Sequence, residues 1–444
     1  MNDDPRLNRS ENYLGWFRDA APYFNANRGR CIVVHFSGEL FNHSILPEFI
    51  HDLALLHSLG VKLVLVPGIR PQINSRLKEQ QIEYQVIDGI RVTKASMVPA
   101  LRDAVATVLL DLQARLSMGL DNTPMRGARI RVVNGNYVTA RPWGIRDGVD
   151  FGFSGEVRRI DTQAIHSQLE NQHVVILPPL GFSPGGDLFN LRSEDLAAKV
   201  AVELKAHKLI LMYEDAPVKD AEGNIIGQFT LKQAQQYLTD HQGHADFDNQ
   251  RHFESAMNAC RLGVQRSHLL DLGVPGALAL ELYSRDGVGT MINADGYDAV
   301  RQATSSDVAG IMELIAPLED SGVLVRREGK SIEADIANFQ VEERDGVIVA
   351  CAAAHWFAEE GFMELACLTV REEYRISGRG EILLKSIEQH AKQLGAHSLF
   401  VLTTQTSDWF RERGFVETDL ASLPMEKQQL YNHQRASKVL LKTL

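Results

Sequence analysis

A short turn near residue 377 combines glycine with arginine, and it is the strongest candidate for a chemical site. It is Arg375-Ile-Ser-Gly378-Arg379-Gly380, and it lies between the apolar run ELACLTV (364–370) and the helical pattern EILLKSIEQH (381–390). Glycine lets the backbone approach a ligand closely, and the start of a helix presents free N–H groups and the positive end of its dipole. Because the two arginines add charge, the turn is suited to a pyrophosphate.

The spacing R-x-x-G-x-G occurs often by chance, so its context carries the argument. The order strand, R-x-x-G-x-G turn, helix, strand over residues 362–404 resembles the GCN5-related N-acetyltransferase family. The resemblance implies acetyl-CoA as co-substrate, with backbone groups of Leu368 and Val370 on the pantetheine arm and the 375–380 turn on the pyrophosphate. The alternative is an ordinary glycine turn that opens a helix.

Acetyl transfer to an amine needs further groups around this turn. A free amino group is mostly protonated at pH 7 and must lose its proton to a base within hydrogen-bond reach. Glu364 is the candidate base, and the alternative is a solvent-facing glutamate of a strand. Backbone donors near Cys367 and Leu368 could stabilise the oxyanion. Ser407, after the strand VLTT, is the candidate proton donor for the leaving thiolate.

The acceptor is suggested by clustered cations in the last third of the chain. Arg326 lies in GVLVRREG, and Arg435 and Lys438 lie in YNHQRASKVLL. Arginine forks suit a dicarboxylic amino acid, although composition alone favours surface charge. The strings LVRR, LFVLTT, WFRERGF and YNHQRASKVL resemble the bacterial N-acetylglutamate synthase family, which implies that Arg326 and Arg435 hold the carboxylates of L-glutamate.

The elements that must position these residues form two blocks. Between residues 30 and 290, apolar runs alternate with helical patterns, which predicts a parallel sheet covered by helices on both faces. We expect strands at 31–36, 61–68, 174–181, 207–213 and 268–272, and helices at 45–60, from 71 and at 194–206.

The second block is a mixed α/β domain with a different order of elements. From residue 300 onward we expect a strand, helices, the strand regions 341–357 and 361–370, a helix at 381–395 and a strand at 397–404. The predicted organisation is a helical arm (1–28), an α/β domain (29–292), a linker (293–299) and the mixed α/β domain (300–444).

Residues 30–292 resemble the amino-acid kinase fold, and acetylglutamate kinases in particular. The matching text is PGIRPQI (67–73), DGIRVT (88–93), FNLRSEDLAAKVAVELKAHKLIL (189–211) and SRDGVGTMI (284–292). The catalytic pattern is altered: His35-Phe-Ser-Gly38 replaces the lysine strand, Glu194 stands at an aspartate position, and the second lysine falls near Arg251-His252. Phosphoryl transfer needs fixed cations, so we expect little kinase activity.

A retained fold without its chemistry favours ligand binding, and the resemblance implies L-arginine as the ligand. The positions that match the arginine pocket of arginine-inhibited acetylglutamate kinases are Tyr23, Lys219, His268, Glu281 and Gly287. Glu281 could pair with the guanidinium, and Tyr23 could stack on it.

The apolar face of residues 11–27 could pack on its own domain or on a neighbouring subunit. The family resemblance implies the second arrangement, a homo-oligomeric ring that is a hexamer.

Composition and residue spacing limit the partners, metals and cellular locations to be expected. A net charge of −11 argues against nucleic-acid partners, and no apolar run reaches membrane-spanning length. The histidines lack ligand spacing, so no metal is expected. Four scattered cysteines and a polar N-terminus without signal features predict a cytoplasmic location.

The sequence therefore predicts an enzyme that acetylates L-glutamate with acetyl-CoA at the start of arginine biosynthesis and is inhibited by L-arginine. Two alternatives stay open: a bifunctional enzyme that also phosphorylates acetylglutamate, and a catalytically silent arginine-binding regulator.

Overall fold

The computed structural model describes residues 5–117, 130–220, 222–241, 247–293, 300–344, 347–377, 379–432 and 437–444. The chain divides into two compact units, Met1–Gly296 and Tyr297–Leu444, which are described separately. Among the described helices, none combines the length and apolar character needed to cross a membrane.

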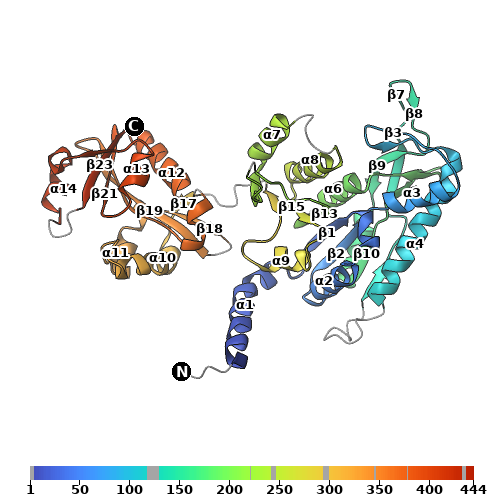
Figure 1. Cartoon of the computed structure of the whole chain (residues 1–444), viewed down its shortest axis with the longest axis horizontal. Coiled ribbons are helices and arrows are strands. Elements are labelled where there is room, and N and C mark those ends of the chain that lie inside the picture. The colour runs from blue at the N-terminus through green and yellow to red at the C-terminus, as the bar shows by residue number, and fades with distance from the viewer. Residues whose placement is uncertain are drawn as a thin grey trace. The chain divides into compact units, whose positions relative to one another are not determined.

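A mostly parallel sheet forms the centre of the first unit (Figure 1). In order across the sheet, its described strands are β14 (Gln228–Thr230), β16 (Thr290–Asn293), β15 (Arg266–Asp271), β13 (Lys208–Tyr213), β1 (Cys31–Phe36), β2 (Lys62–Pro67), β10 (His173–Ile176) and β5 (Arg131–Val133). The β15–β16 pair is antiparallel, and the other six pairs are parallel. The predicted parallel-rich α/β fold is confirmed.

The helices cover both faces of this sheet. One face holds α2 (Leu46–Ser58), α3 (Arg70–Glu79), α4 (Val98–Ser117) and α9 (Ala277–Tyr283), and the other holds α5 (Thr162–Glu170), α6 (Ser193–Glu203), α7 (Leu231–Asp240) and α8 (Phe247–Arg261). Residues of β1 alternate between the two cores: Ile32 and Val34 join the first, and Val33 joins the second. His35 therefore lies on the α6 and α8 face.

The predicted strand 174–181 is wrong, because prolines divide it. β10 ends at Ile176, Pro178 and Pro179 follow, and β11 (Leu180–Phe182) belongs to another sheet. Proline has no N–H for a sheet ladder and does not continue a central strand. The second sheet is ordered β12 (Leu188–Asn190), β11, β6 (Val138–Pro142) and β9 (Gly155–Ile160), and two hairpins pair β3 (Val86–Ile87) with β4 (Ile90–Arg91) and β7 (Ile145–Arg146) with β8 (Val149–Asp150).

The N-terminal helix α1 (Pro5–Asn27) is anchored at its C-terminal end. The Asn27 side-chain amide donates to the Leu282 carbonyl of α9 at 3.0 Å, and the Phe24 ring lies 5.0 Å from the Tyr283 ring. Earlier along the helix, Trp16 and Phe17 are 51% and 56% exposed. The helix thus packs on its own domain at one end and leaves apolar side chains uncovered further up.

The second unit is built on one sheet, whose described strands are mostly antiparallel. Their order is β17 (Val300–Gln302), β18 (Phe339–Arg344), β19 (Val347–Phe357), β20 (Phe362–Val370), β21 (Ser398–Thr403), β23 (Lys438–Thr443) and β22 (Val416–Thr418). The β20–β21 pair is parallel. Helices α12 (Arg379–Gln393) and α13 (Ser407–Arg411) pack on one face, and α10 (Val308–Asp320) and α11 (Gly329–Ala334) pack on the other.

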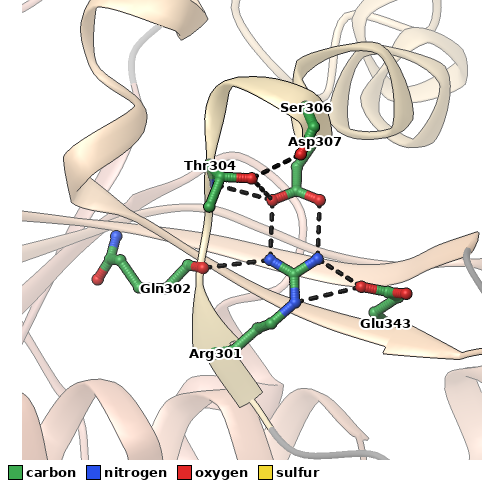
Figure 2. Close-up of polar contacts among 6 residues, drawn as sticks. All are labelled: Arg301, Gln302, Thr304, Ser306, Asp307 and Glu343. Atoms are coloured by element: carbon green, nitrogen blue, oxygen red, sulfur yellow. Dashed lines mark hydrogen bonds and ion pairs between the residues drawn. The ribbon is translucent and has the colours of Figure 1, made fainter.

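One arginine ties the start of this unit together (Figure 2). The Arg301 guanidinium of β17 donates two hydrogen bonds of 2.8 Å to Asp307, the residue before α10, and also contacts Glu343 of β18. Asp307 accepts from the Thr304 backbone N–H at 2.7 Å as well. The hydrogen bond from Arg301 is the main cause that lowers the pKa of Asp307.

Candidate functional site

Strands β20 and β21 diverge along their length. Their parallel pairing covers Phe362–Leu365 and Ser398–Val401, and no pairing between the two continues in the described residues beyond. At the point of divergence Cys367 has a φ of +53°, and the register between β19 and β20 shifts between Cys351 and Ala353. An extra residue in one strand bends it locally, so this β-bulge accounts for the opening.

The opening contains a cavity of about 490 Å³, here called the splay cavity. Its size lies in the range of small-molecule sites. The lining comes from the diverging parts of β20 and β21, the turn before α12 and its start, α13 with the residues before and after it, and the end of α10 with the segment that follows.

Most of the predicted cofactor residues lie in this cavity. Cys367, Leu368, Val370, Arg375 and Gly380 all line it, whereas Gly378 lies outside the described residues. A Cβ added to Gly380 would lie 3.3 Å from the Trp409 ring, so glycine lets α12 start close to α13 there.

Arg379 does not have the predicted place. It is 6% exposed, it forms an ion pair with Glu342, and its guanidinium lies 4.9 Å from the Tyr374 ring centroid. Within the described lining of the splay cavity it is absent. Glu342 is 0% exposed, and a buried carboxylate requires a partner, which explains the position of Arg379.

Sequence reasoning missed a cation that does line the cavity. The Arg413 guanidinium stacks 4.0 Å from the Trp409 ring centroid and donates to the Trp409 carbonyl at 2.9 Å. Both residues line the splay cavity together with Arg375. Both residues belong to the string WFRERGF (409–415), whose residue types alone do not indicate the stacking of Arg413 on Trp409.

The candidate base Glu364 is buried rather than solvent-facing. It is 5% exposed and pairs with Lys427 of α14 (Met425–Gln429) at 2.6 Å. On β20 it lies in the last paired stretch, opposite His355 and Phe400. Its chain neighbour Leu365 lines the splay cavity, whereas Glu364 itself is outside the described lining. A buried carboxylate therefore stands where the two strands begin to separate.

The candidate proton donor Ser407 is half-buried at the first position of α13, outside the described lining. Its neighbour Thr406 lines the cavity and shares a 2.9 Å hydrogen bond with the Thr403 hydroxyl. The structure thus favours Thr406 over Ser407 as the hydroxyl available to a ligand.

The predicted carboxylate-binding cations are not brought together by the described residues. Arg326 is 85% exposed and lies 3.8 Å from Asp320, and Lys438 lies 3.4 Å from Glu417. Arg435 lies outside the described residues. The neighbouring Arg327 is better enclosed: its side chain is 25% exposed and lies 3.9 Å from Asp335.

Three of the five residues predicted for the arginine pocket meet around one carboxylate. Glu281 of α9 accepts from His268 of β15 at 2.6 Å and from the Val288 and Gly289 N–H groups at 2.7 and 3.0 Å. A Cβ on Gly287 would lie 2.4 Å from Glu281 Oε2. A carboxylate offers about four acceptor positions, so one is left for a guanidinium.

Protonation in this pocket follows from burial and hydrogen bonding. Burial lowers the pKa of His268, which keeps the imidazole neutral at pH 7. Burial alone would raise the pKa of Glu281, but the hydrogen bond from His268 and those of the loop outweigh it and lower the pKa. Tyr23 of α1 packs against the hydrophobic core to which α9 also contributes. Lys219 lies exposed in the segment after β13.

The positions that depart from the kinase pattern gather around a second cavity, of about 280 Å³, here called the β1 cavity. His35, Glu194 and His252 line it. Burial, with a contribution from His252, lowers the pKa of His35 to about 3, so a neutral imidazole stands where a kinase has a lysine. Weak phosphoryl transfer stays a prediction, and the missing positive charge is its physical reason.

Comparison with known proteins covers both units. Residues 30–271 match the amino acid kinase family, and residues 315–415 match the acetyltransferase (GNAT) family. The amino-acid acetyltransferase of Yersinia enterocolitica is 46% identical over 438 residues, which cover 98% of this chain and 99% of that protein. The enzyme of the same name from Yersinia pseudotuberculosis is 45% identical over the same length.

Solved structures give the same result. N-acetylglutamate synthase from Neisseria gonorrhoeae, complexed with coenzyme A and L-arginine, is 34% identical with a TM-score of 0.85, covering 97% of this chain and 99% of that one. The complex of that enzyme with coenzyme A and N-acetyl-glutamate matches over the same shares with a TM-score of 0.62. The chain therefore belongs to the amino-acid acetyltransferase family, as an acyltransferase that joins an amino-acid kinase fold to a GNAT domain.

Proposed function

We propose that the chain transfers the acetyl group of acetyl-CoA to the amino group of L-glutamate, and that L-arginine inhibits the reaction from the first unit. The observation that carries the proposal is the splay cavity, where two cations, Arg375 and Arg413, accompany the diverging strands. Coenzyme A, L-arginine and N-acetyl-glutamate are all bound by the synthase that resembles this chain over both units.

The chemistry follows from the residues at the divergence. Glu364 takes a proton from the acceptor amine, directly or through one water, and the neutral nitrogen then attacks the thioester carbonyl. Backbone N–H groups near the bulge at Cys367 and Leu368 stabilise the oxyanion. As the C–S bond breaks, the nitrogen loses its second proton and becomes an amide, and the departing coenzyme A thiolate gains one proton. The Thr406 hydroxyl lines the cavity and would relay this proton from nitrogen to sulfur.

The same proposal extends to pathway and assembly. Acetylation of glutamate with inhibition by arginine is the behaviour expected of the first step in arginine biosynthesis, in the cytoplasm. The uncovered side chains Trp16 and Phe17 support a homo-oligomer joined through α1.

The test is release of coenzyme A from acetyl-CoA with L-glutamate, L-aspartate, L-glutamine or L-lysine, each with and without L-arginine. We expect release with glutamate that arginine suppresses. If arginine leaves the release unchanged, the acetyltransferase activity would be supported and the proposed arginine effector site would be overturned. Preference for another acceptor would overturn glutamate, and no release with any acceptor would overturn the catalytic proposal.

A further inference from the structure

Three potential metal ligands from separate parts of the chain meet at the β1 cavity. His35 belongs to β1, Glu194 to α6 and His252 to α8. One nitrogen or oxygen atom from each side chain lies within 4.8 Å of the corresponding atoms of the other two. Because the positions are far apart in sequence, the absence of ligand spacing among the histidines could not exclude this arrangement.

A hydrogen-bonded chain fixes the orientation of the innermost ligand. The Ser193 hydroxyl donates to Glu194 Oε2 at 3.2 Å, so it accepts from the N–H at His35 Nε2, 3.0 Å away. This leaves a lone pair on Nδ1 of His35. That atom has no hydrogen-bond partner among the described residues, although His35 is only 1% exposed.

An unpartnered buried acceptor is costly, and a bound cation would satisfy it. The arrangement also matches the usual surroundings of a metal-bound histidine, whose other ring nitrogen donates to a fixed neighbour. Here Ser193 is that neighbour, and it holds the carboxylate of Glu194 at the same time.

The charge of the cavity favours a cation over a phosphate. Glu39, Glu214 and Asp215 line it together with Glu194, whereas Arg70 is the arginine in the described lining. Four carboxylates would repel a phosphate group and attract a divalent ion. A phosphate group, the ligand expected of an intact kinase site, is therefore disfavoured in this cavity, and a cation is preferred.

We propose that His35, Glu194 and His252 bind one divalent transition-metal ion, with Zn²⁺ as the best chemical match. Two imidazoles and one carboxylate are a common zinc ligand set that leaves a fourth position open, here toward the β1 cavity. Zinc ligands at about 2.0–2.2 Å from the metal stand about 3.4 Å apart, so the three side chains must draw together.

His252 is the ligand able to make this adjustment. It is half-buried, and its ring stacks on Tyr213 with the centroids 4.1 Å apart. Sliding along a flat stacked ring lets the imidazole approach His35, whose own ring centroid lies 5.3 Å away. The bound ion would join β1, α6 and α8 and would stabilise the first unit by mass action.

The test uses the full-length chain without an affinity tag, stripped with a chelator and titrated with Co²⁺. We expect one Co²⁺ per chain, with the visible absorption of a low-coordinate nitrogen and oxygen site, and displacement by Zn²⁺. Glu194→Gln and His252→Gln should each weaken binding by more than about tenfold. The matched control is His207→Gln, because His207 is a partly buried histidine of the same unit outside the cluster.

Two results of the titration would overturn the proposal: no binding by the intact chain, or equal affinity in the wild type and both ligand variants. If a variant misfolds by circular dichroism, zinc-edge X-ray absorption of the unmodified chain decides. Two imidazoles with oxygen ligands would support the site, and sulfur ligands or fewer imidazoles would exclude it. Acetyl transfer does not enter these measurements, so failure here leaves the proposed function untouched.

Discussion

Glu364 carries the most chemistry of any single side chain in the proposed reaction. It is buried, ion-paired with Lys427, and located where β20 leaves β21. A general base must be close to the acceptor amine and sheltered from competing water, and burial at the end of the paired stretch gives Glu364 that shelter. Lys427 is the cation next to this carboxylate in the absence of substrate. The ammonium group of the arriving substrate would take the place of Lys427.

Replacing this carboxylate tests its role. We expect Glu364→Gln to lower kcat by about 10²- to 10⁴-fold, because the amide keeps the shape but cannot accept a proton. Steady-state release of coenzyme A measures the effect. Glu359→Gln, at an exposed glutamate of the turn before β20, is the matched control and should retain activity. A Glu364→Gln rate within threefold of wild type would exclude Glu364 as the base.

Residue types and local spacing predicted part of the splay cavity. Arg375, Gly380 and the residues around the bulge line this cavity together, because the turn is contiguous with the strand. Their role in binding the cofactor stays a prediction. Arg379 was misplaced because its partner Glu342 is distant in sequence, and only the tertiary fold reveals a buried carboxylate there. Arg413 was missed for the same reason, since its stacking on Trp409 does not follow from the spacing alone.

At the scale of elements, the loop after α9 has little room for an added side-chain atom at Gly287. Gly287 has a φ of +63°, and a Cβ there would meet Glu281 Oε2 at 2.4 Å. Gly276, at the start of α9, has a similar φ of +68° but no atom within 4 Å of an added Cβ. An alanine would therefore be strained by the positive φ at both positions, but its Cβ would clash with Glu281 only at position 287.

We expect Gly287→Ala to raise the L-arginine concentration for half-inhibition by about tenfold or more, and Gly276→Ala to change it little. Each carries the backbone cost of about 1–2 kcal/mol for a left-handed residue. Only the first moves the carboxylate that holds the pocket. Inhibition curves normalised to each variant's uninhibited rate measure the difference, and equal shifts in both variants would exclude Glu281 from the effector site.

The corner around Arg301 makes a pH-dependent contribution to stability. The folded pKa of Asp307 lies below its unfolded value of about 3.9, so its contribution is present above that pH and disappears as pH falls through the folded pKa. Asp307→Asn should destabilise the chain by about 1 kcal/mol at pH 7.

Urea unfolding of the full chain at several pH values checks this expectation. The difference between Asp307→Asn and wild type should shrink below about pH 4. Asp408→Asn, at an aspartate whose side chain is 88% exposed, is the control and should show no such trend. A difference that is constant from pH 7 to 3 would mean that the ionised form of Asp307 is not what stabilises the corner.

The central strand of the first unit was predictable from sequence, whereas the two-residue strands were not. The 31–36 strand was placed to the residue, because a buried parallel strand is apolar throughout. The hairpins β3–β4 and β7–β8 were missed, although Asp88-Gly89 and Asp147-Gly148 carry the turn signal and all four residues have positive φ. Two-residue strands contain too little alternation for a periodicity argument, so only the turn could have indicated them.

For the whole molecule, the uncovered part of α1 predicts self-association. Trp16 and Phe17 are more than half exposed, while the end of the same helix is fixed on α9. We expect Trp16→Glu with Phe17→Glu to lower the mass of the assembly measured by light scattering, because charge would have to enter an apolar interface. Leu262→Glu, at a leucine that is 64% exposed, is the control. An unchanged mass in the double variant would place the subunit interface elsewhere.

The link between the two units has a thermodynamic signature that does not depend on their arrangement. If L-arginine favours one conformational population, the factor by which it weakens acetyl-CoA binding must equal the factor by which acetyl-CoA weakens arginine binding. Calorimetric titration of each ligand, alone and at saturation of the other, measures both factors. We expect equal factors of about 5 to 150 in wild type. In Gly287→Ala the two factors should again be equal. Because this variant is expected to bind arginine more weakly, a higher arginine concentration is needed to measure them. If acetyl-CoA does not alter arginine affinity, inhibition does not act through acetyl-CoA binding.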